Sequence, residues 1–415
     1  MDSAGFLVNC DGHHVVLYLS LSWVDEQPTQ YSQEEKKRRA IMASIASEQP
    51  SSGVPRTSSA EALPRSSIIS TQHTTRPLTP TGPKPALPRS TGGVTLNTGY
   101  LMPSLGLGTW GGGEPAENSA KAVTAALNMG YRLLDCAEAY HNESEIGVAL
   151  EQAFCSDSLN ISRKDVFLVS KVWNTNHASQ HVREACLNTL KNLKTDYLDL
   201  YLIHWPIAFE YTGVGPGENI PNDALGHCKL ANNISIYETW RAMEKLVEDG
   251  LVRSIGVSNF SSVQLADVLS YAKFPPAVNQ VECHAYLPQE NILKMCRSKS
   301  IILMAYAPLG RPGSVRVNKL GDVLIEDDII CEIAGKRAST PAIVLLRWNM
   351  QRGVVVIPKS TNEKRLAENF SSMVSHELQL TDKEMEQING LAKNGGRRFR
   401  YCNYSWGVGG CNIFD

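Results

Sequence analysis

The sequence predicts an α/β protein: a (β/α)8 TIM barrel with an N-terminal β-hairpin plug and a long disordered N-terminal extension. From Gly93 onward, short apolar runs alternate with amphipathic helical stretches over about 300 residues, a pattern typical of a parallel barrel. Before residue 93 the composition is quite different. Three consecutive apolar runs also end in chemically active residues, as barrel strands do at the end that carries the active site.

The eight strands are predicted at Leu105–Gly108, Arg132–Asp135, Val166–Lys171, Leu198–His204, Val252–Val257, Ala277–Glu282, Ile302–Ala305 and Val354–Ile357. Helical patterns between them include Glu117–Met129, Glu143–Phe154, His181–Leu193, Ile236–Asp249 and Pro341–Met350. A hairpin over Gly93–Met102, with its turn at Asn97-Thr98-Gly99, is expected to plug the bottom of the barrel.

The N-terminal extension is poor in apolar residues. Between Ile41 and Gly92 about half the residues are Ser, Thr or Pro, too little apolar surface to offset the entropy of ordering. We therefore predict disorder for residues 1–92, the barrel for 93–395 and a C-terminal loop near the barrel mouth for 396–415. The run Lys36-Lys37-Arg38-Arg39 is either a nuclear address or a solvated patch.

Composition limits the classes of partner. The chain has 415 residues, of which 42% are hydrophobic, and its formal charge of -2 gives no reason to expect nucleic acid or a membrane surface. No apolar stretch reaches the roughly 18 residues of a membrane helix, and Val15–Val24 lacks the basic lead of a secretory signal. Ten cysteines without close pairing favour reduced thiols, no metal site and a cytoplasmic location.

The residues at the ends of three consecutive runs form a chemical set. Asp135 follows the first run and Tyr140 lies shortly after it, whereas Lys171 ends the second run. His204 ends the third. A phenol that donates a proton, an ammonium that lowers its pKa, a carboxylate that stabilises the ammonium and an imidazole that orients the substrate indicate carbonyl reduction. Each residue alone is commonly a capping, surface or core residue, so the prediction depends on the set.

Two segments compete as phosphate-binding sites. Gly106–Gly111 matches the dinucleotide-binding pattern GxGxxG, but Trp110 stands where the backbone should approach a pyrophosphate, and no second domain follows. At Ile357–Arg365 a strand ends, and the helix predicted from Glu363 to Phe370 begins with Ser, Thr and Asn as caps. Its N-terminus, with Lys359 and Arg365, favours a ribose 2′-phosphate and therefore NADPH over NADH.

Several ordered motifs resemble the aldo-keto reductases, and most closely the aldehyde and aldose reductase branch, over Gly93–Ala392. They are Gly106–Trp110, Gly130–Tyr140 with Asn142-Glu143, Ser170–Trp173, Ile203–Pro206, Gly256–Phe260, Asn279–His284 and Ile357–Asn369. The resemblance implies a catalytic tetrad of Asp135, Tyr140, Lys171 and His204 and a monomer that reduces small carbonyl compounds, namely aldehydes, ketones or aldoses.

The resemblance also assigns cofactor-binding and substrate-binding residues. Ser258, Asn259 and Gln280 would hold the nicotinamide carboxamide, and Tyr306 would stack on its ring. The other cofactor-binding residues that it implies are Gly108, Thr109, Trp110, Lys359, Ser360, Arg365, Glu368 and Asn369. Trp110, Trp173 and Trp205 match the walls of the substrate pocket.

Departures from the family pattern concern the cofactor strap and the tail. Gly111 stands where relatives often carry a basic residue, and the matching loop, Gly310–Ser314, has no acidic partner for it. The strap over NADPH is therefore expected to be looser. The tail at Arg397–Tyr401 also differs from the family, which leaves the substrate open. Two other functions stay open: a cofactor-binding regulatory subunit with little turnover, and an interaction protein that uses residues 1–92.

Overall fold

The structure is a computed structural model that describes residues 92–215, 219–312, 321–374, 378–393 and 399–402, together with two strands near the N-terminus. The chain divides into two units, Met1–Pro77 and Leu78–Asp415. In the first unit, β1 (Phe6–Cys10) pairs antiparallel with β2 (His13–Leu17). The disorder predicted for the rest of the extension, and the basic run Lys36–Arg39, lie outside the described residues.

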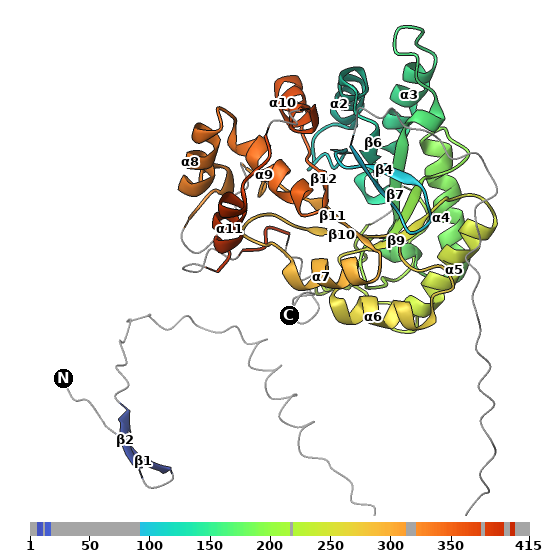
Figure 1. Ribbon diagram of the computed structural model, residues 1–415. Helices are drawn as coiled ribbons and strands as arrows, with labels where there is room; N and C mark the ends of the chain where they lie inside the picture. The colour runs from blue at the N-terminus through green and yellow to red at the C-terminus, as the bar shows by residue number, and fades with distance from the viewer. Residues whose placement is uncertain are drawn as a thin grey trace, which may run out of the picture. The chain divides into compact units, whose positions relative to one another are not determined.

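The second unit is built around an eight-stranded sheet whose strands lie side by side in chain order (Figure 1). They are β5 (Leu107–Gly108), β6 (Leu133–Asp135), β7 (Phe167–Val172), β8 (Leu200–Ile203), β9 (Ile255–Ser258), β10 (Val278–Glu282), β11 (Ile302–Tyr306) and β12 (Val355–Ile357). Every pair is parallel. All eight predicted strands are confirmed, and their ends differ from the predicted ones by at most three residues.

The barrel closes between its first and last strands. Leu105 and Val356 form a parallel bridge, and the Gly106 amide donates to the Val356 carbonyl at 2.9 Å. At Gly108 the backbones are so close that a β-carbon would lie 2.9 Å from the carbonyl oxygen of Ile357. Glycine is therefore required here for the strands to approach closely enough to close the sheet.

The predicted hairpin is confirmed as β3 (Gly93–Thr95) and β4 (Leu101–Pro103), which pair antiparallel. The Leu96 amide donates to the Tyr100 carbonyl and closes the turn. Leu96 and Met102 are buried in one apolar cluster with inward residues of the barrel strands. The hairpin therefore seals the barrel interior at the end from which the strands start.

Helices surround the strands (Figure 1). They are α2 (Ala116–Met129), α3 (Glu143–Phe154), α4 (Ser179–Asn192), α5 (Ile236–Glu248), α6 (Ser262–Tyr271), α7 (Glu290–Ser298), α8 (Asp328–Lys336), α9 (Pro341–Gln351), α10 (Glu363–Val374) and α11 (Asp382–Gly390). Short 3₁₀ turns are η1 (Glu138–Tyr140), η2 (Arg163–Asp165), η3 (Asn174–Asn176) and η4 (Leu324–Glu326). Local signals agree with these starts: the Thr340 side chain caps α9 just before Pro341.

The described helices do not include one long and apolar enough to cross a bilayer. Within the described residues, no group of three or more His, Cys, Asp or Glu side chains is arranged to hold a metal ion.

Candidate active site

Strand alternation explains why the reactive side chains meet. Leu133, Val169 and Leu202 all belong to the apolar cluster inside the barrel. Along a strand, a residue two positions further on points to the same side. The residues two positions after these three are Asp135, Lys171 and His204. The apolar core layer of the barrel is thus followed, at the carboxyl ends of β6, β7 and β8, by a carboxylate, an ammonium and an imidazole.

The Lys171 ammonium is the centre of this group. Its Nζ lies 2.9 Å from both oxygens of Asp135, 2.8 Å from the Cys136 carbonyl and 3.2 Å from the Tyr140 hydroxyl. The side chains of Lys171 and Asp135 are 0% and 3% exposed. A buried ammonium needs such partners, since an unpaired charge in the interior is strongly unfavourable. The structure therefore brings together three of the four residues predicted as catalytic.

Burial dominates the protonation of the phenol. It raises the pKa of Tyr140 to about 12, although the nearby Lys171 ammonium acts in the opposite direction. The ammonium thus acts on this pKa as expected, but removal from water outweighs its charge and the net shift is upward. For Lys171, burial lowers the pKa, but Asp135 and Tyr140 more than offset this and raise it overall. The ammonium is thus charged and the phenol protonated near neutral pH.

His204 completes the group as a neutral ring. Burial, with help from Lys171 and His177, holds its pKa well below the usual value. Its ring centroid lies 5.8 Å from that of Tyr140 and 5.0 Å from that of Trp173, both edge to face. Its backbone carbonyl accepts from Asn259 Nδ2 at 3.0 Å. A neutral imidazole beside a phenol can orient a carbonyl oxygen by hydrogen bonding without adding charge.

The residues predicted to hold the nicotinamide form one hydrogen-bonded group at the ends of β9, β10 and β11. Asn259 Nδ2 donates to Ser258 Oγ, and the Tyr306 hydroxyl donates to Asn259 Oδ1 at 2.9 Å. Ser258 Oγ donates to the Gln280 carbonyl, and Gln280 Nε2 donates to Asp135 at 2.6 Å. Asn259 has a φ of 65°, a left-handed conformation that asparagine tolerates. These amides and hydroxyls are thus linked directly to the Asp135–Lys171 pair.

The residues that follow β5 contact the backbone of Asp135, because β5 is the neighbour of β6 in the sheet. Thr109 donates to the Asp135 carbonyl through both its amide and its Oγ1. Trp110 follows and is 41% exposed, with the Arg311 guanidinium 4.7 Å from its ring centroid. Arg311 Nη1 also reaches the Cys402 sulfur at 3.6 Å. The loop after β11 therefore does meet the loop after β5, through the cation–π contact between Arg311 and Trp110.

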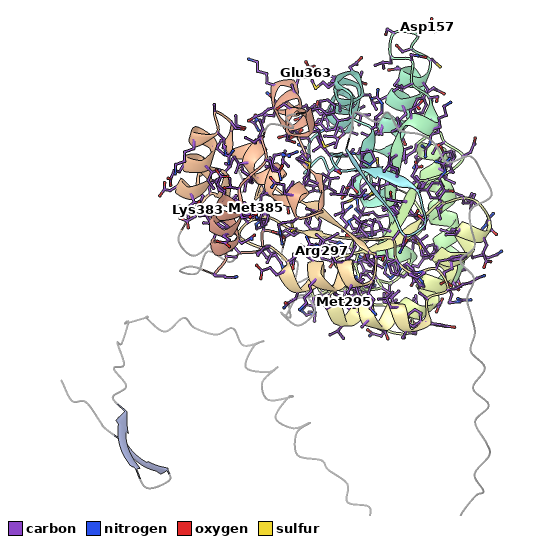
Figure 2. All side chains as sticks on the ribbon, in the orientation of Figure 1. Asp157, Met295, Arg297, Glu363, Lys383 and Met385 are labelled. Carbon is purple, nitrogen blue, oxygen red and sulfur yellow. The ribbon has the colours of Figure 1, made fainter. Side chains whose placement is uncertain are left out.

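The residues predicted to bind the 2′-phosphate lie at or near the start of α10, marked by Glu363 in Figure 2. Asn362 Oδ1 accepts from the Arg365 amide at 3.1 Å and so caps the helix. Glu368 and Asn369 lie further along α10, and Ser360 Oγ accepts from the Asn362 amide. Lys359, one of the two expected cations, forms an ion pair of 3.0 Å with Glu114. No local pattern predicts this pair, because its residues are far apart in the chain.

Of the three predicted pocket tryptophans, two pack together. Trp173 and Trp205 form an apolar cluster with Phe209 and Cys228, from the loop between β8 and α5. Trp110 lies under Arg311 instead. Phe209, 6.2 Å from Trp173 between ring centroids, was not among the predicted residues, because nothing in the sequence marks a phenylalanine in a long loop as a neighbour of Trp173.

The described part of the tail, residues 399–402, docks at the end of β10. The Tyr401 and Cys402 amides donate to the buried Glu282 carboxylate at 2.6 and 2.9 Å. This carboxylate also lies 3.0 Å from His284 Nε2, and its pKa is lowered overall despite burial, through His284 and the two amides. The other residues of the predicted C-terminal loop lie outside the described residues.

Comparison with known proteins shows which family the chain belongs to. The model of the Aldo/keto reductase family matches residues 104–393. Aldo-keto reductase family 1 member A1-A of Danio rerio is 43% identical over 303 residues, covering 72% of this chain and 90% of the relative. Aldose reductase B of Dictyostelium discoideum is 46% identical over 296 residues, covering 71% of this chain and 90% of the relative.

A solved aldose reductase from Schistosoma japonicum is also similar, with a TM-score of 0.66 and 42% sequence identity. The similarity covers 73% of this chain and 93% of that one. The matched segment contains all four residues of the buried Asp135–Tyr140–Lys171–His204 group. The chain is thus an oxidoreductase that belongs to the aldo/keto reductase family, in its aldehyde and aldose reductase branch.

Proposed function

We propose that the protein reduces aldehydes, and some ketones or open-chain aldoses, to alcohols with NADPH, and that Tyr140 donates the proton. The observation that carries this proposal is the 3.2 Å contact between the Tyr140 hydroxyl and Lys171 Nζ, itself held by both oxygens of Asp135. A phenol in contact with a fixed, buried ammonium is well suited to give up its proton to a developing alkoxide.

The residues at the barrel mouth fit a nicotinamide cofactor. The side chains of Ser258, Asn259 and Gln280 supply amide and hydroxyl groups that suit a carboxamide, and Tyr306 supplies an aromatic face. The capped N-terminus of α10, with Lys359 and Arg365, suits a 2′-phosphate, which favours NADPH over NADH. When bound, the cofactor supplies the hydride.

The protein's own groups then have separate roles. The protonated Tyr140 hydroxyl transfers its proton to the carbonyl oxygen as that oxygen becomes an alkoxide, a far stronger base than the phenolate. Lys171 stabilises the phenolate that remains, and Asp135 keeps the ammonium in position. Neutral His204 holds the carbonyl oxygen, while Trp173 and Trp205 provide an apolar wall. Aromatic and medium-chain aldehydes match this wall best.

We further propose that the protein acts as a monomer in the cytoplasm. One chain supplies the whole tetrad, without a residue from a second copy. In the described part of the chain, the cysteine thiols are free, which suits a reducing compartment.

The test is NADPH oxidation, followed by its absorbance, with an aromatic aldehyde and with glyceraldehyde, and with NADH in parallel. We expect turnover with NADPH and a loss of roughly 10²–10⁴-fold in kcat for Tyr140→Phe, because the proton donor is removed. Tyr237→Phe is the matched control, since Tyr237 is exposed on α5. Equal activity of Tyr140→Phe and the parent, or the absence of any turnover, would contradict the proposal. The second result would favour a regulatory subunit.

A further inference from the structure

Glu138 is a buried carboxylate beside the catalytic tyrosine that the mechanism above does not use. It begins η1, the short turn that Tyr140 ends, and it is only 7% exposed. Nearby carboxylates are bonded differently: Asp135 binds Lys171, and Glu143 accepts from the hydroxyls of Ser170 and Thr189. Glu138 instead accepts hydrogen bonds from two different loops.

The first loop follows β7. Glu138 Oε2 accepts from the Trp173 amide at 3.2 Å, and Oε1 accepts from Asn176 Nδ2 at 2.8 Å. The second loop lies between β8 and α5, and the amide of Gly215 donates to the same carboxylate. Burial raises the pKa of Glu138, and these three donors oppose that shift. Three N–H groups converging on one carboxylate form a strong, geometrically defined anchor, because hydrogen bonds to a charged acceptor exceed neutral ones.

Further contacts join the second loop to the same place. Trp173 Nε1 donates to the Asn219 carbonyl at 2.6 Å, and Asn219 Nδ2 donates to the Ala139 carbonyl at 3.2 Å. Trp173 is thus held at two points: Glu138 accepts from its backbone amide, and the second loop accepts from its indole nitrogen. Its ring lies edge to face against His204, where a carbonyl substrate is expected.

We infer that Glu138 is a positioning residue that fixes Trp173, together with Gly215 and Asn219 of the loop between β8 and α5, and thereby sets the preference for bulky aromatic carbonyl substrates. The inference rests on the proposed function. A substrate with an aromatic ring beside His204 depends on the position of Trp173, whereas glyceraldehyde is too small to use that wall. Within the described residues, the hydrogen bonds of the Glu138 carboxylate go to Trp173, Asn176 and Gly215. They do not include Lys171 or the residues that would hold the cofactor.

The experiment compares Glu138→Ala, Glu138→Gln and the parent. With Glu138→Ala we expect the KM for an aromatic aldehyde to rise about tenfold, equivalent to roughly 1.4 kcal/mol. The KM for glyceraldehyde, kcat and the dissociation constant of NADPH should change less than about twofold. Glu138→Gln keeps the size of the side chain but replaces one acceptor oxygen with a donor, so its effect should be intermediate.

Hydrogen exchange gives a readout that is independent of turnover. The amides of Trp173 and Gly215 should exchange faster in Glu138→Ala, since both lose their acceptor. Glu151→Ala is the matched control, because Glu151 pairs only with exposed Lys194 on the outer surface among its described contacts. Unchanged exchange in Glu138→Ala, or equal loss for both aldehydes, would overturn the inference. Failure of the proposed function would instead appear in the parent and in Tyr140→Phe, whatever residue occupies position 138.

Discussion

The two halves of the barrel mouth hold their charges in different ways. In the catalytic half, at β6, β7 and β8, Asp135 and Lys171 are buried and paired before any ligand binds. In the phosphate half, at the start of α10, Lys359 is 32% exposed and pairs with Glu114, 43% exposed, from the loop after β5. A buried pair is rigid because each charge requires its partner, whereas an exposed pair contributes little and exchanges readily with water or an anion. We therefore expect the geometry of the proposed catalytic group to be fixed by burial, and the proposed cofactor affinity to be adjustable.

The largest effect should follow from breaking the buried pair. Lys171→Met should lower kcat by about 10³-fold, since the phenolate loses its stabilising charge. It should also lower the free energy of unfolding by roughly 3–5 kcal/mol, because the Asp135 carboxylate stays buried without its cation. Steady-state kinetics and urea unfolding measure the two losses.

Two variants make this test specific. Adding Asp135→Asn to Lys171→Met should restore most of the stability but none of the activity, since it removes the unpaired charge. Lys191→Met, at an exposed position on α4, should leave both quantities unchanged. A single Lys171→Met variant with near-parental kcat would show that the buried pair is structural only.

A second prediction concerns the acid sensitivity of the catalytic half. Burial lowers the pKa of His177 to about 3. Below about pH 6.5 the unfolded chain therefore binds a proton that the folded chain does not, and this residue's contribution to stability falls as pH falls. Between pH 7 and pH 5 the loss is about 2 kcal/mol. His177→Asn should remove it, so the unfolding free energy of the variant should drop about 2 kcal/mol less than that of the parent.

Comparison with the parent is essential because Glu143 acts in the opposite direction. Burial raises its pKa to about 7, so its protonation stabilises the folded chain as pH falls from 7 towards 4.5. Chemical denaturation at both pH values separates the two, since Glu143 contributes equally to both proteins. Parallel pH dependences for the parent and His177→Asn would mean that His177 is not buried as a neutral ring.

The smallest effect should come from the phosphate half. Glu114→Gln frees Lys359 for the cofactor, so the dissociation constant of NADPH should fall about two- to fivefold, and less at high salt. NADH, which lacks the 2′-phosphate, should bind unchanged. Quenching of tryptophan fluorescence measures both constants. Glu117→Gln, at an exposed position on the first turn of α2, is the matched control. Weaker NADPH binding in Glu114→Gln would mean that Glu114 positions Lys359 and does not compete for it.

The fold and the centre of the site were predictable because both depend on short periodicities. Alternation along β6 and β7 places Asp135 and Lys171 on the same face as the buried Leu133 and Val169, and this alternation is visible in the sequence. Parallel strands in chain order then require these positions to meet at one end. The capped start of α10 was predictable for a similar reason, since Asn362 and Arg365 lie three residues apart in one local sequence signal.

Contacts between loops were not predictable in the same way. Glu138 and Gly215, Trp110 and Arg311, and Glu114 and Lys359 are each far apart in the chain, and no periodic pattern links them. The net pKa of Tyr140 was not predictable either: Lys171 lowers it, as expected, but burial outweighs the ammonium and raises it overall. The sequence shows that an ammonium is near, but how completely the phenol is removed from water depends on everything packed around it.

By itself, then, the sequence determined the eight-stranded barrel, its hairpin plug and the identity of the group at its mouth, because alternation, capping and apolar runs are local properties of the chain. Only the tertiary structure decided which loops meet above that group, which cations are already paired and how far burial shifts each pKa. Those properties depend on distances between residues remote in sequence and on the exclusion of water by packing. No single segment of the chain determines either of these.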